Sequence, residues 1–208
     1  MRRTMLLMAT MALTLLVASG VALAVTKIGT NGPDFLKGTN GADNLDGRGA
    51  NDVLYALAGQ DNLLGGKGKD WLLTGVSRAL GGNKNSAGGP GNDGVAGGLG
   101  SDNVVGGSGG DFIADGPDRE FATDRLSAGD GNDFVGTWNK PAFKDIVSCG
   151  PGFDGVFADR IDVIASDCER VPHTRAGRDR LGQAFERSGL FEGLAPFPPP
   201  SPERERTG

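Results

Sequence analysis

A nine-residue recurrence of aspartate constrains this chain more than any other feature of its sequence. Residues 29–73 form five contiguous nonapeptides, each with an aspartate at the sixth position, the acid position, and an apolar residue at the eighth. The unit at residues 65–73, GGKGKDWLL, shows the pattern most clearly. No helix has a period of nine, so the recurrence predicts one short strand per unit, separated by glycine-rich turns.

A second block keeps the same register over residues 88–114, GGPGNDGVA, GGLGSDNVV and GGSGGDFIA. Asp70 and Asp93 are 23 residues apart, two nonapeptides plus five. We therefore expect residues 74–82 to be a unit with Ala79 in place of its acid, and residues 83–87 to be a loop. After an insertion around 116–118, worn units continue the ladder with Asp124, Asp133, Asp145 and Asp154. Asp162 is one residue out of phase, so we expect the ladder to end before it.

The composition limits what else can hold such a chain together. It has 208 residues with 37 glycines and 6% aromatic residues, which leaves few large side chains for a conventional core. Of its 26 acidic residues, 20 are aspartates by count along the sequence. Short carboxylates beside glycine suit turns and the ligation of hard cations better than helix surfaces.

The repeat geometry predicts a metal site. Glycines that take positive φ let each turn aim backbone carbonyls at a common point. Two units make one coil, so residues eighteen apart stack at about 4.8 Å, with Asp34, Asp52 and Asp70 on one edge and Asp43 and Asp61 on the other. Carboxylates this close repel unless a cation lies between them. The alternative is that the aspartates only cap turns, but a capping role does not require an acid in nearly every unit.

The ligand chemistry favours several Ca²⁺ ions. An irregular cage of carboxylate and carbonyl oxygens suits calcium better than the strictly octahedral magnesium. Zinc and copper lack suitable ligands, because His173 is the only histidine and the two cysteines have a simpler explanation.

The stretch DVLYALAGQDNLLGGKGKD, residues 52–70, resembles the hemolysin-type, or RTX, calcium-binding repeats, whose consensus is GGxGxD followed by x, a large apolar residue and x. The resemblance covers residues 29–157 and implies an all-β fold, a right-handed parallel β-roll (β-solenoid). Ala50, Ala56, Ala79 and Cys149 depart from the consensus, so sites that touch their units are weaker matches. The implied ligands are the acids and the carbonyl oxygens of turn glycines, namely Asp34, Asp43, Asp52, Asp61, Asp70, Asp93, Asp102, Asp111, Asp133 and Asp154 with Gly29, Gly38, Gly66, Gly68, Gly89, Gly91, Gly98, Gly100, Gly107 and Gly109.

The first 24 residues have the pattern of a secretory signal peptide. Arg2 and Arg3 precede an apolar run, and residues 22–24 form an Ala-x-Ala type cleavage site. The alternative, a permanent membrane anchor, fits less well because the run is short for a bilayer span. Cleavage before Val25 removes two arginines and no acids, which changes the net charge from −5 to −7. We therefore expect a secreted, extracellular protein that does not favour nucleic acid and has no membrane span; its protein or cell-surface partner is unknown.

The only two cysteines, Cys149 and Cys168, are 19 residues apart, one more than a full coil. A continuing roll would place them on the same edge of neighbouring coils, within the Cα separation that a disulfide accepts. Two free thiols or a metal pair are the alternatives, and both fit poorly with export. We predict a disulfide that closes the last coil.

These patterns divide the chain into a signal peptide (1–24), a first repeat block (25–73), a degenerate unit and loop (74–87), a second repeat block with insertions and a disulfide-closed end (88–173), and a mostly disordered tail (174–208) with at best a short helix at 181–188.

We expect no enzymatic activity. Residues 106–110 fit G-x-S-x-G, but their serine lies inside a repeat, and no H-E-x-x-H is present. Trp71 and Trp138 are expected to pack laterally or to cover an end of the stack. Two function classes remain: a stand-alone calcium-dependent module with a structural or surface-interaction role, or an accessory or stabilising subunit of a secreted enzyme.

Overall fold

The structure is a computed structural model that describes residues 23–75, 82–116, 122–137 and 142–170. Most of the expected signal peptide, Trp138, His173 and the tail from 174 to 208 therefore lie outside the described residues.

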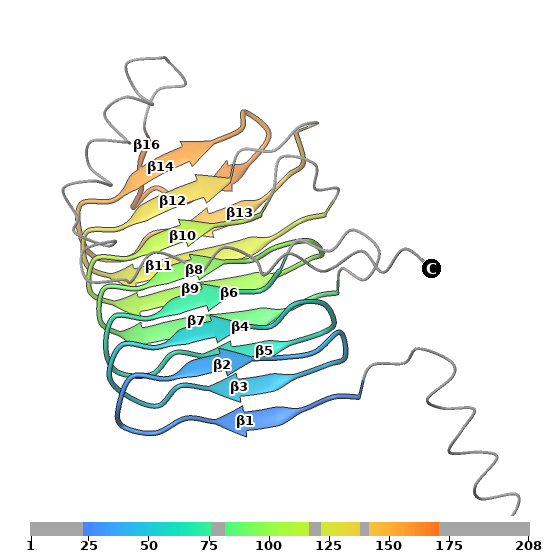
Figure 1. Ribbon diagram of the computed structural model, residues 1–208. Coiled ribbons are helices and arrows are strands. Elements are labelled where there is room, and N and C mark those ends of the chain that lie inside the picture. Colours follow the sequence, from blue (N-terminus) through green and yellow to red (C-terminus); the bar gives the residue numbers. More distant parts are fainter. Residues whose placement is uncertain (1–22, 76–81, 117–121, 138–141, 171–208) are drawn as a thin grey trace, which may run out of the picture.

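The described chain winds back and forth between two parallel eight-stranded sheets (Figure 1). The first sheet has the order β1-β3-β5-β7-β9-β11-β13-β15 and the second the order β16-β14-β12-β10-β8-β6-β4-β2, so each coil adds one strand to each sheet. The predicted parallel β-solenoid is confirmed. The strands are β1 (Thr26–Ile28), β2 (Phe35–Lys37), β3 (Asn44–Asp46), β4 (Val53–Tyr55), β5 (Asn62–Leu64), β6 (Trp71–Leu73), β7 (Asn85–Pro90), β8 (Gly94–Ala96), β9 (Asn103–Ser108), β10 (Phe112–Ala114), β11 (Arg125–Asp130), β12 (Phe134–Thr137), β13 (Ile146–Ser148), β14 (Gly155–Ala158), β15 (Val163–Ile164) and β16 (Glu169–Arg170).

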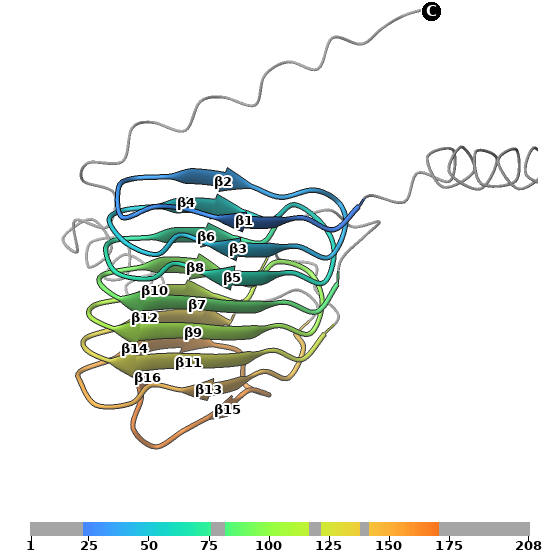
Figure 2. The same cartoon turned by 90° about the horizontal axis from the view of Figure 1, so that it is seen from below.

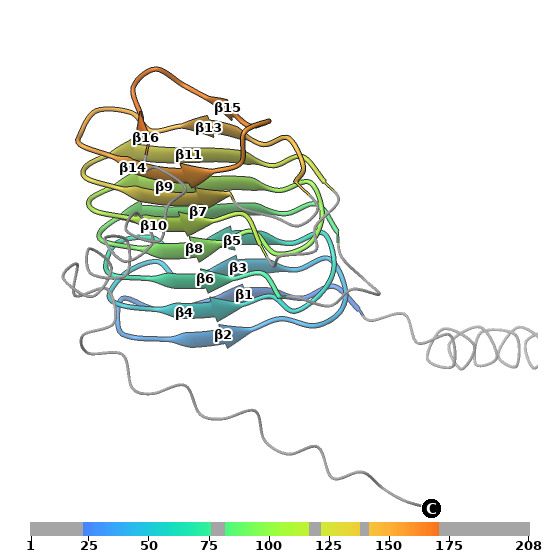
Figure 3. The ribbon, with the colours of Figure 1, turned by 90° about the horizontal axis from the view of Figure 1, so that it is seen from above.

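The apolar residue at the eighth position of each unit forms the core. Side chains alternate across a strand, so the central residue of each triplet points between the sheets and pairs in register with its counterpart one coil away. Leu36, Leu54 and Leu72 are successive partners in the second sheet. Figures 2 and 3 show the coils stacked along one axis. The fully buried members of this core are Leu45, Leu54, Leu63, Leu72, Val95, Val104, Ile113, Leu126, Val135, Val147 and Val156.

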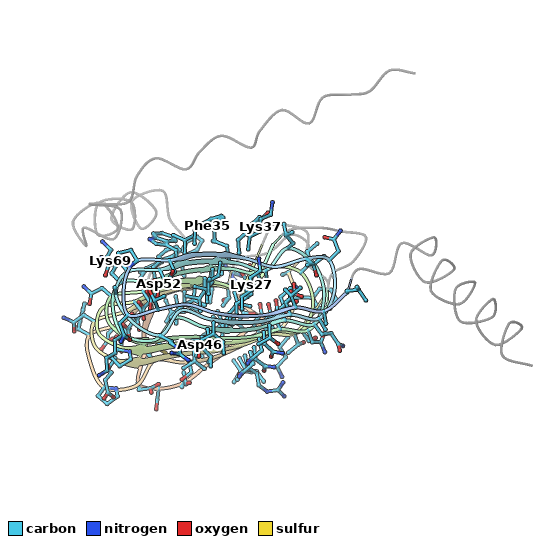
Figure 4. All side chains as sticks on the ribbon, turned by 60° about the horizontal axis from the view of Figure 1, so that its bottom comes forward. Lys27, Phe35, Lys37, Asp46, Asp52 and Lys69 are labelled. Carbon is cyan, nitrogen blue, oxygen red and sulfur yellow. A yellow bond between two sulfur atoms is a disulfide. The ribbon has the colours of Figure 1, made fainter. Side chains whose placement is uncertain are left out.

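A lysine covers the N-terminal end of this core. Lys27 is the register partner of Leu45, so it takes the inward position of the first coil. Its Nζ donates a hydrogen bond to the carbonyl oxygen of Lys37 at 2.6 Å. Figure 4 shows Lys27 between the two sheets, whereas Phe35 and Asp46 point outward. The apolar part of the lysine side chain thus covers the first layer of the core, while its charged end stays near solvent.

The turns form two different edges. The regular edge, on the left in Figure 1, comprises residues 29–34, 47–52, 65–70, 88–93, 106–111, 128–133 and 149–154. The interrupted edge, on the right, comprises residues 38–43, 56–61 and 97–102 together with the described parts of three longer turns, 74–75 and 82–84, 115–116 and 122–124, and 137 and 142–145. Each of these seven regular-edge turns has six residues, and only the turn before β16, residues 165–168, is shorter. The three insertions within the repeat region all fall in turns of the interrupted edge.

The structure corrects the expected loop at residues 83–87. Asn85, Ser86 and Ala87 belong to β7 and pair with Asn62, Leu63 and Leu64 of β5. The five extra residues therefore lie earlier, in the turn between Leu73 and Lys84. Lys84, rather than Ala79, takes the acid position, and Ser86 takes the apolar one. The expectation was wrong because the period of nine is recognised by an aspartate at the sixth position and an apolar residue at the eighth, and this unit has Lys84 and Ser86 there.

The ladder also continues past the point where we expected it to end. The N–H of Asp145 donates to Oδ1 of Asp162 at 3.0 Å, and Val163 of β15 pairs with Ile146 of β13. Asp162 therefore occupies the acid position of one more coil. The repeat unit that ends at Asp162 has eight residues after Asp154 instead of nine. Asp162 is therefore out of phase in the sequence, although it lies in line with the ladder in space.

The predicted disulfide is confirmed. Cys149 and Cys168 are bonded, with their Cα atoms 5.3 Å apart. Cys149 is the first residue of the regular-edge turn before β14, and Cys168 ends the next turn of that edge, directly before β16. The bond therefore joins the last two coils on the regular edge.

Three non-glycine residues have a left-handed backbone in the turns. Glycines such as Gly68, at φ 133°, occupy this conformation elsewhere, and a Cβ there would overlap the carbonyl of Ala50. Arg48, Ala50 and Leu57 have φ of 75°, 76° and 78°. A left-handed backbone costs a residue with a Cβ about 1–2 kcal/mol, so these positions weaken the first block.

Ala50→Gly should therefore increase the free energy of unfolding by about 0.5–1 kcal/mol, because the relief of strain exceeds the entropy that glycine adds to the unfolded chain. Urea unfolding at saturating calcium measures this change. Ala96→Gly in β8, where φ is not positive, is the matched control and should lower stability. A lower stability for both variants would contradict the assignment of strain to position 50.

Candidate calcium sites

The aspartates of each edge form a hydrogen-bonded ladder, which is continuous on the regular edge. On the regular edge the N–H of each acid-position residue donates to Oδ1 of the aspartate one coil later. The distances from nitrogen to Oδ1 are 2.8 Å for Asp34 to Asp52, Asp52 to Asp70, Asp70 to Asp93, Asp93 to Asp111 and Asp111 to Asp133, and 2.9 Å for Asp133 to Asp154. At the end of the ladder Oε2 of Glu169 accepts from the N–H of Asp154 at 2.6 Å.

The interrupted edge repeats this ladder with one break. The N–H of Asp43 donates to Oδ1 of Asp61 at 3.0 Å. The ladder is broken at the next coil, where Lys84 has no carboxylate to accept from the N–H of Asp61, and it resumes with the N–H of Lys84 as donor. The later donor and acceptor pairs are Lys84 to Asp102 (2.8 Å), Asp102 to Asp124 (2.8 Å), Asp124 to Asp145 (2.9 Å) and Asp145 to Asp162 (3.0 Å).

The second carboxylate oxygen is the chemically informative one. Each Oδ1 is used by the ladder, which fixes the rotamer of the side chain and turns Oδ2 into the turn. Figure 4 shows Asp52 on the inner side of its turn and Lys69 pointing away from it. Burying a charged oxygen without a partner is costly, so these atoms call for a cation or a proton. Oδ2 is buried without a hydrogen-bond partner in Asp52, Asp61, Asp70, Asp93, Asp102, Asp111, Asp133 and Asp154.

The first residue of five regular-edge turns is a glycine that packs closely against this oxygen. A Cβ on Gly65 would lie 2.6 Å from Oδ2 of Asp70 and 2.6 Å from the carbonyl oxygen of Gly88 in the next coil. At Gly47 the corresponding distances are 2.5 Å to Oδ2 of Asp52 and 2.6 Å to the carbonyl of Gly65. A side chain there would collide with carboxylate and carbonyl oxygens of successive coils, which therefore converge beside the glycine.

This donor set fits calcium. Among the described residues no group of three or more His, Cys, Asp and Glu side chains converges on one point, so a metal here would take most of its ligands from the backbone. Carboxylate oxygens with several carbonyls, in a cage of irregular shape, are the ligands that calcium prefers. Asp70 and the turn carbonyls on either side of it, including that of Gly88, are representative of the residues that would hold an ion.

The two N-terminal turns differ from the rest. The N–H of Thr30 donates to Oδ2 of Asp34 at 2.6 Å, and its hydroxyl donates to the same oxygen at 3.0 Å. Thr39 makes the same two contacts with Asp43. Asp34 and Asp43, which were expected to be ligands like the others, therefore have protein donors on the oxygens that are unpartnered in later coils.

Burial raises the pKa of the regular-edge carboxyls from Asp52 to Asp154, and neighbouring carboxylates add to the effect. On the regular edge the pKa of Asp70 rises to about 6, that of Asp93 to about 8, that of Asp111 to about 7 and that of Asp133 to about 6. The shifts are largest in the middle of the stack, where burial is greatest. Without a metal ion the central carboxyls are thus poor anions near neutral pH.

The glycines expected to supply carbonyls divide into two groups. Gly29 and Gly38 are the first residues of their turns, beside the carboxylates of Asp34 and Asp43. The others have a positive φ at the second or fourth position of a turn, and they are Gly66, Gly68, Gly89, Gly91, Gly98, Gly100, Gly107 and Gly109.

Sequence reasoning missed four aspartates as candidate ligands. Asp124, Asp145 and Asp162 occupy acid positions of the interrupted edge. The spacing signal for the first two was visible, but insertions on either side obscured their role. Asp115 lies at the start of the same edge's turn after β10, a position that is glycine in the turns beginning at Gly38 and Gly97. Burial raises its pKa to about 8, with further contributions from Asp145, Asp124 and Asp162.

Two other motifs have structural settings. Ser108 of the G-x-S-x-G match is exposed at the end of β9, inside a repeat turn. Trp71 is buried, and its ring lies against Gly94 of β8, where a Cβ would come within 2.8 Å of it. This agrees with lateral packing.

Comparison with known families agrees with this geometry. The RTX calcium-binding nonapeptide repeat matches the chain in four copies, at residues 28–63, 46–76, 81–113 and 122–135. The fold and the repeat match define a calcium-binding β-solenoid. This chain is a hemolysin-type RTX repeat protein. Searches of curated proteins and of solved structures found no match. Within the described ranges no helix is long and apolar enough to cross a membrane.

The raised pKa values predict how pH affects the metal-free protein. The folded pKa values lie above the ordinary value of 3.8, so between about pH 4 and pH 8 the folded state binds more protons than the unfolded state. Its free energy of unfolding should therefore fall as pH rises through this range. Circular dichroism in resin-treated, calcium-free buffers should show more β structure at pH 5 than at pH 8.

Saturating calcium should reverse this trend, because the ion requires deprotonated carboxylates. A metal-free protein that gains stability between pH 5 and pH 8 would show that the ladder carboxyls are not destabilised by burial.

Proposed function

We propose that the mature chain is a secreted calcium-binding β-roll that becomes ordered when it meets external calcium and then acts as a rigid structural or surface-interaction module. The observation that carries this proposal is the series of buried, unpartnered Oδ2 atoms, repeated coil after coil beside turn carbonyls. A cation at each level would neutralise a pair of carboxylates and complete the coordination that the turns offer.

Coupling between binding and folding follows from the charge arrangement. Ladder aspartates of neighbouring coils are linked by single hydrogen bonds and lie about one strand spacing apart, so ionising all of them without a cation is unfavourable along the whole edge. Because no such stack exists in the unfolded chain, calcium binds the folded state preferentially and its binding energy becomes folding energy.

Export is supported by both ends of the described roll. Val25, the expected first residue of the mature chain, donates its N–H to Oδ1 of Asp43 at 2.8 Å, so the ladder begins where the signal peptide would end. The Cys149–Cys168 disulfide at the other end suits an oxidising compartment. Calcium outside cells is abundant enough to load sites with dissociation constants of about 10⁻⁴ to 10⁻³ M, the range common for extracellular modules.

Calcium titration of the purified mature chain tests the proposal directly. Circular dichroism should show a largely disordered chain in chelator and a cooperative gain of β structure, with a midpoint at about 10⁻⁴ to 10⁻³ M calcium. Magnesium at the same concentrations should produce little change, because the cage is not octahedral. A chain that is equally folded in chelator and in calcium would contradict the proposal.

Two aspartates of one turn allow a matched test of the ligands. Asp133 is buried in the ladder, whereas Asp130, three residues earlier, is exposed at the end of β11. Asp133→Asn keeps the Oδ1 acceptor but removes the charge, so it should raise the calcium midpoint about three- to tenfold. Asp130→Asn removes the same charge from the same turn and should change the midpoint by less than about twofold. Equal shifts would indicate that only net charge matters, rather than ligation.

A further inference from the structure

One coil of the interrupted edge has a lysine where its neighbours have an aspartate. Lys84 lies between Asp61 and Asp102 in the ladder, and it is only 2% exposed. A lysine is almost never this deeply buried unless its charge is compensated. Its backbone keeps the ladder contact, donating to Oδ1 of Asp102 at 2.8 Å.

The side chain of Lys84 points toward backbone carbonyls of two successive turns. Its Nζ donates to the carbonyl oxygen of Gly82 in its own turn at 2.8 Å and to that of Leu99 in the next coil at 2.8 Å. The ammonium is thus bound by turn carbonyls from two successive coils, which is how a cation between coils would be coordinated.

The carboxylates on both sides of Lys84 respond to its charge. Burial raises the pKa of Asp102 to about 7, and among the influences that lower it the Lys84 ammonium is the largest. Burial also raises the pKa of Asp61, and Lys84 again acts in the opposite direction. The ammonium therefore supplies positive charge to the aspartates above and below it.

Other donors of the protein satisfy oxygens along the same edge. The hydroxyl of Thr74 donates to the carbonyl oxygen of Gly97, the first residue of the next turn. On the regular edge the equivalent carbonyls, such as that of Gly88, lie beside an unpartnered Oδ2. The hydroxyl of Thr137 likewise donates to Oδ2 of Asp162 at 2.9 Å.

We propose that the Lys84 ammonium is a built-in cation that replaces calcium at this level of the interrupted edge, so that the positive charge between Asp61 and Asp102 comes from the protein rather than from an ion. This inference rests on the proposed function, because it assumes that the other ladder levels take calcium. It implies that the calcium array of the interrupted edge is split into two segments, whereas that of the regular edge is continuous.

Restoring the repeat acid tests the proposal. Lys84→Asp should create the missing ligand, so the variant should bind about one more calcium ion per chain than the wild type, measured by equilibrium dialysis at saturating calcium. Its stability should also rise more steeply with calcium concentration. Lys84→Asp that binds no more calcium than the wild type, or that stays unfolded in saturating calcium, overturns the inference.

Removing the charge is the second arm. Lys84→Met keeps the chain length but leaves the carboxylates and the two carbonyls facing each other, so at saturating calcium its melting temperature should fall by at least about 5 °C. Lys67→Met, at an exposed lysine of a regular-edge turn, is the control and should melt like the wild type. Lys84→Met with wild-type stability would overturn the inference. A wild type that binds no calcium would instead refute the proposed function.

Discussion

The hydrogen bond from the N–H of one aspartate to Oδ1 of the next organises everything else in this roll. It links coils along both edges and gives a partner to a backbone N–H that would otherwise be buried without one. It also fixes each carboxylate in one rotamer. The same bond leaves Oδ2 buried and facing the turn carbonyls. The stacking of the coils and the affinity for a metal ion therefore have a common origin. When Oδ1 accepts the bond that aligns the coils, Oδ2 of the same carboxylate is left buried without a partner, and a cation can neutralise it.

The two edges use this arrangement differently. On the regular edge the first turn position is glycine in five successive turns, and the oxygens around it are left for an ion. On the interrupted edge the same position is occupied by Ala56, Thr74 and Asp115 among others, and a lysine interrupts the acids. A fold that is symmetric in its backbone is thus asymmetric in its chemistry, since side chains of the protein supply on one edge some of the contacts that ions would supply on the other.

Much of this could be predicted from the sequence because aspartate and leucine recur with the period of the coil. The period predicted the stacking of Leu54 on Leu72 and the proximity of Cys149 to Cys168, both of which depend only on counting residues. The period could not place Lys84. An insertion inside the preceding turn shifts the nine-residue register, and Ser86 stands where other units have the apolar residue that would reveal the shift. Nor could the period predict which oxygen of a carboxylate accepts from a backbone N–H and which is left for a metal, since that depends on the rotamer that the neighbouring coil imposes.

The confinement of insertions to one edge has a consequence for how this chain can change. A turn of the regular edge packs its first glycine against a carboxylate and the next coil, so a longer turn would displace atoms at two levels. On the interrupted edge three turns have already accepted extra residues while the sheets keep their register. New peptide segments can therefore be displayed from that side, in a row whose spacing is set by the strands.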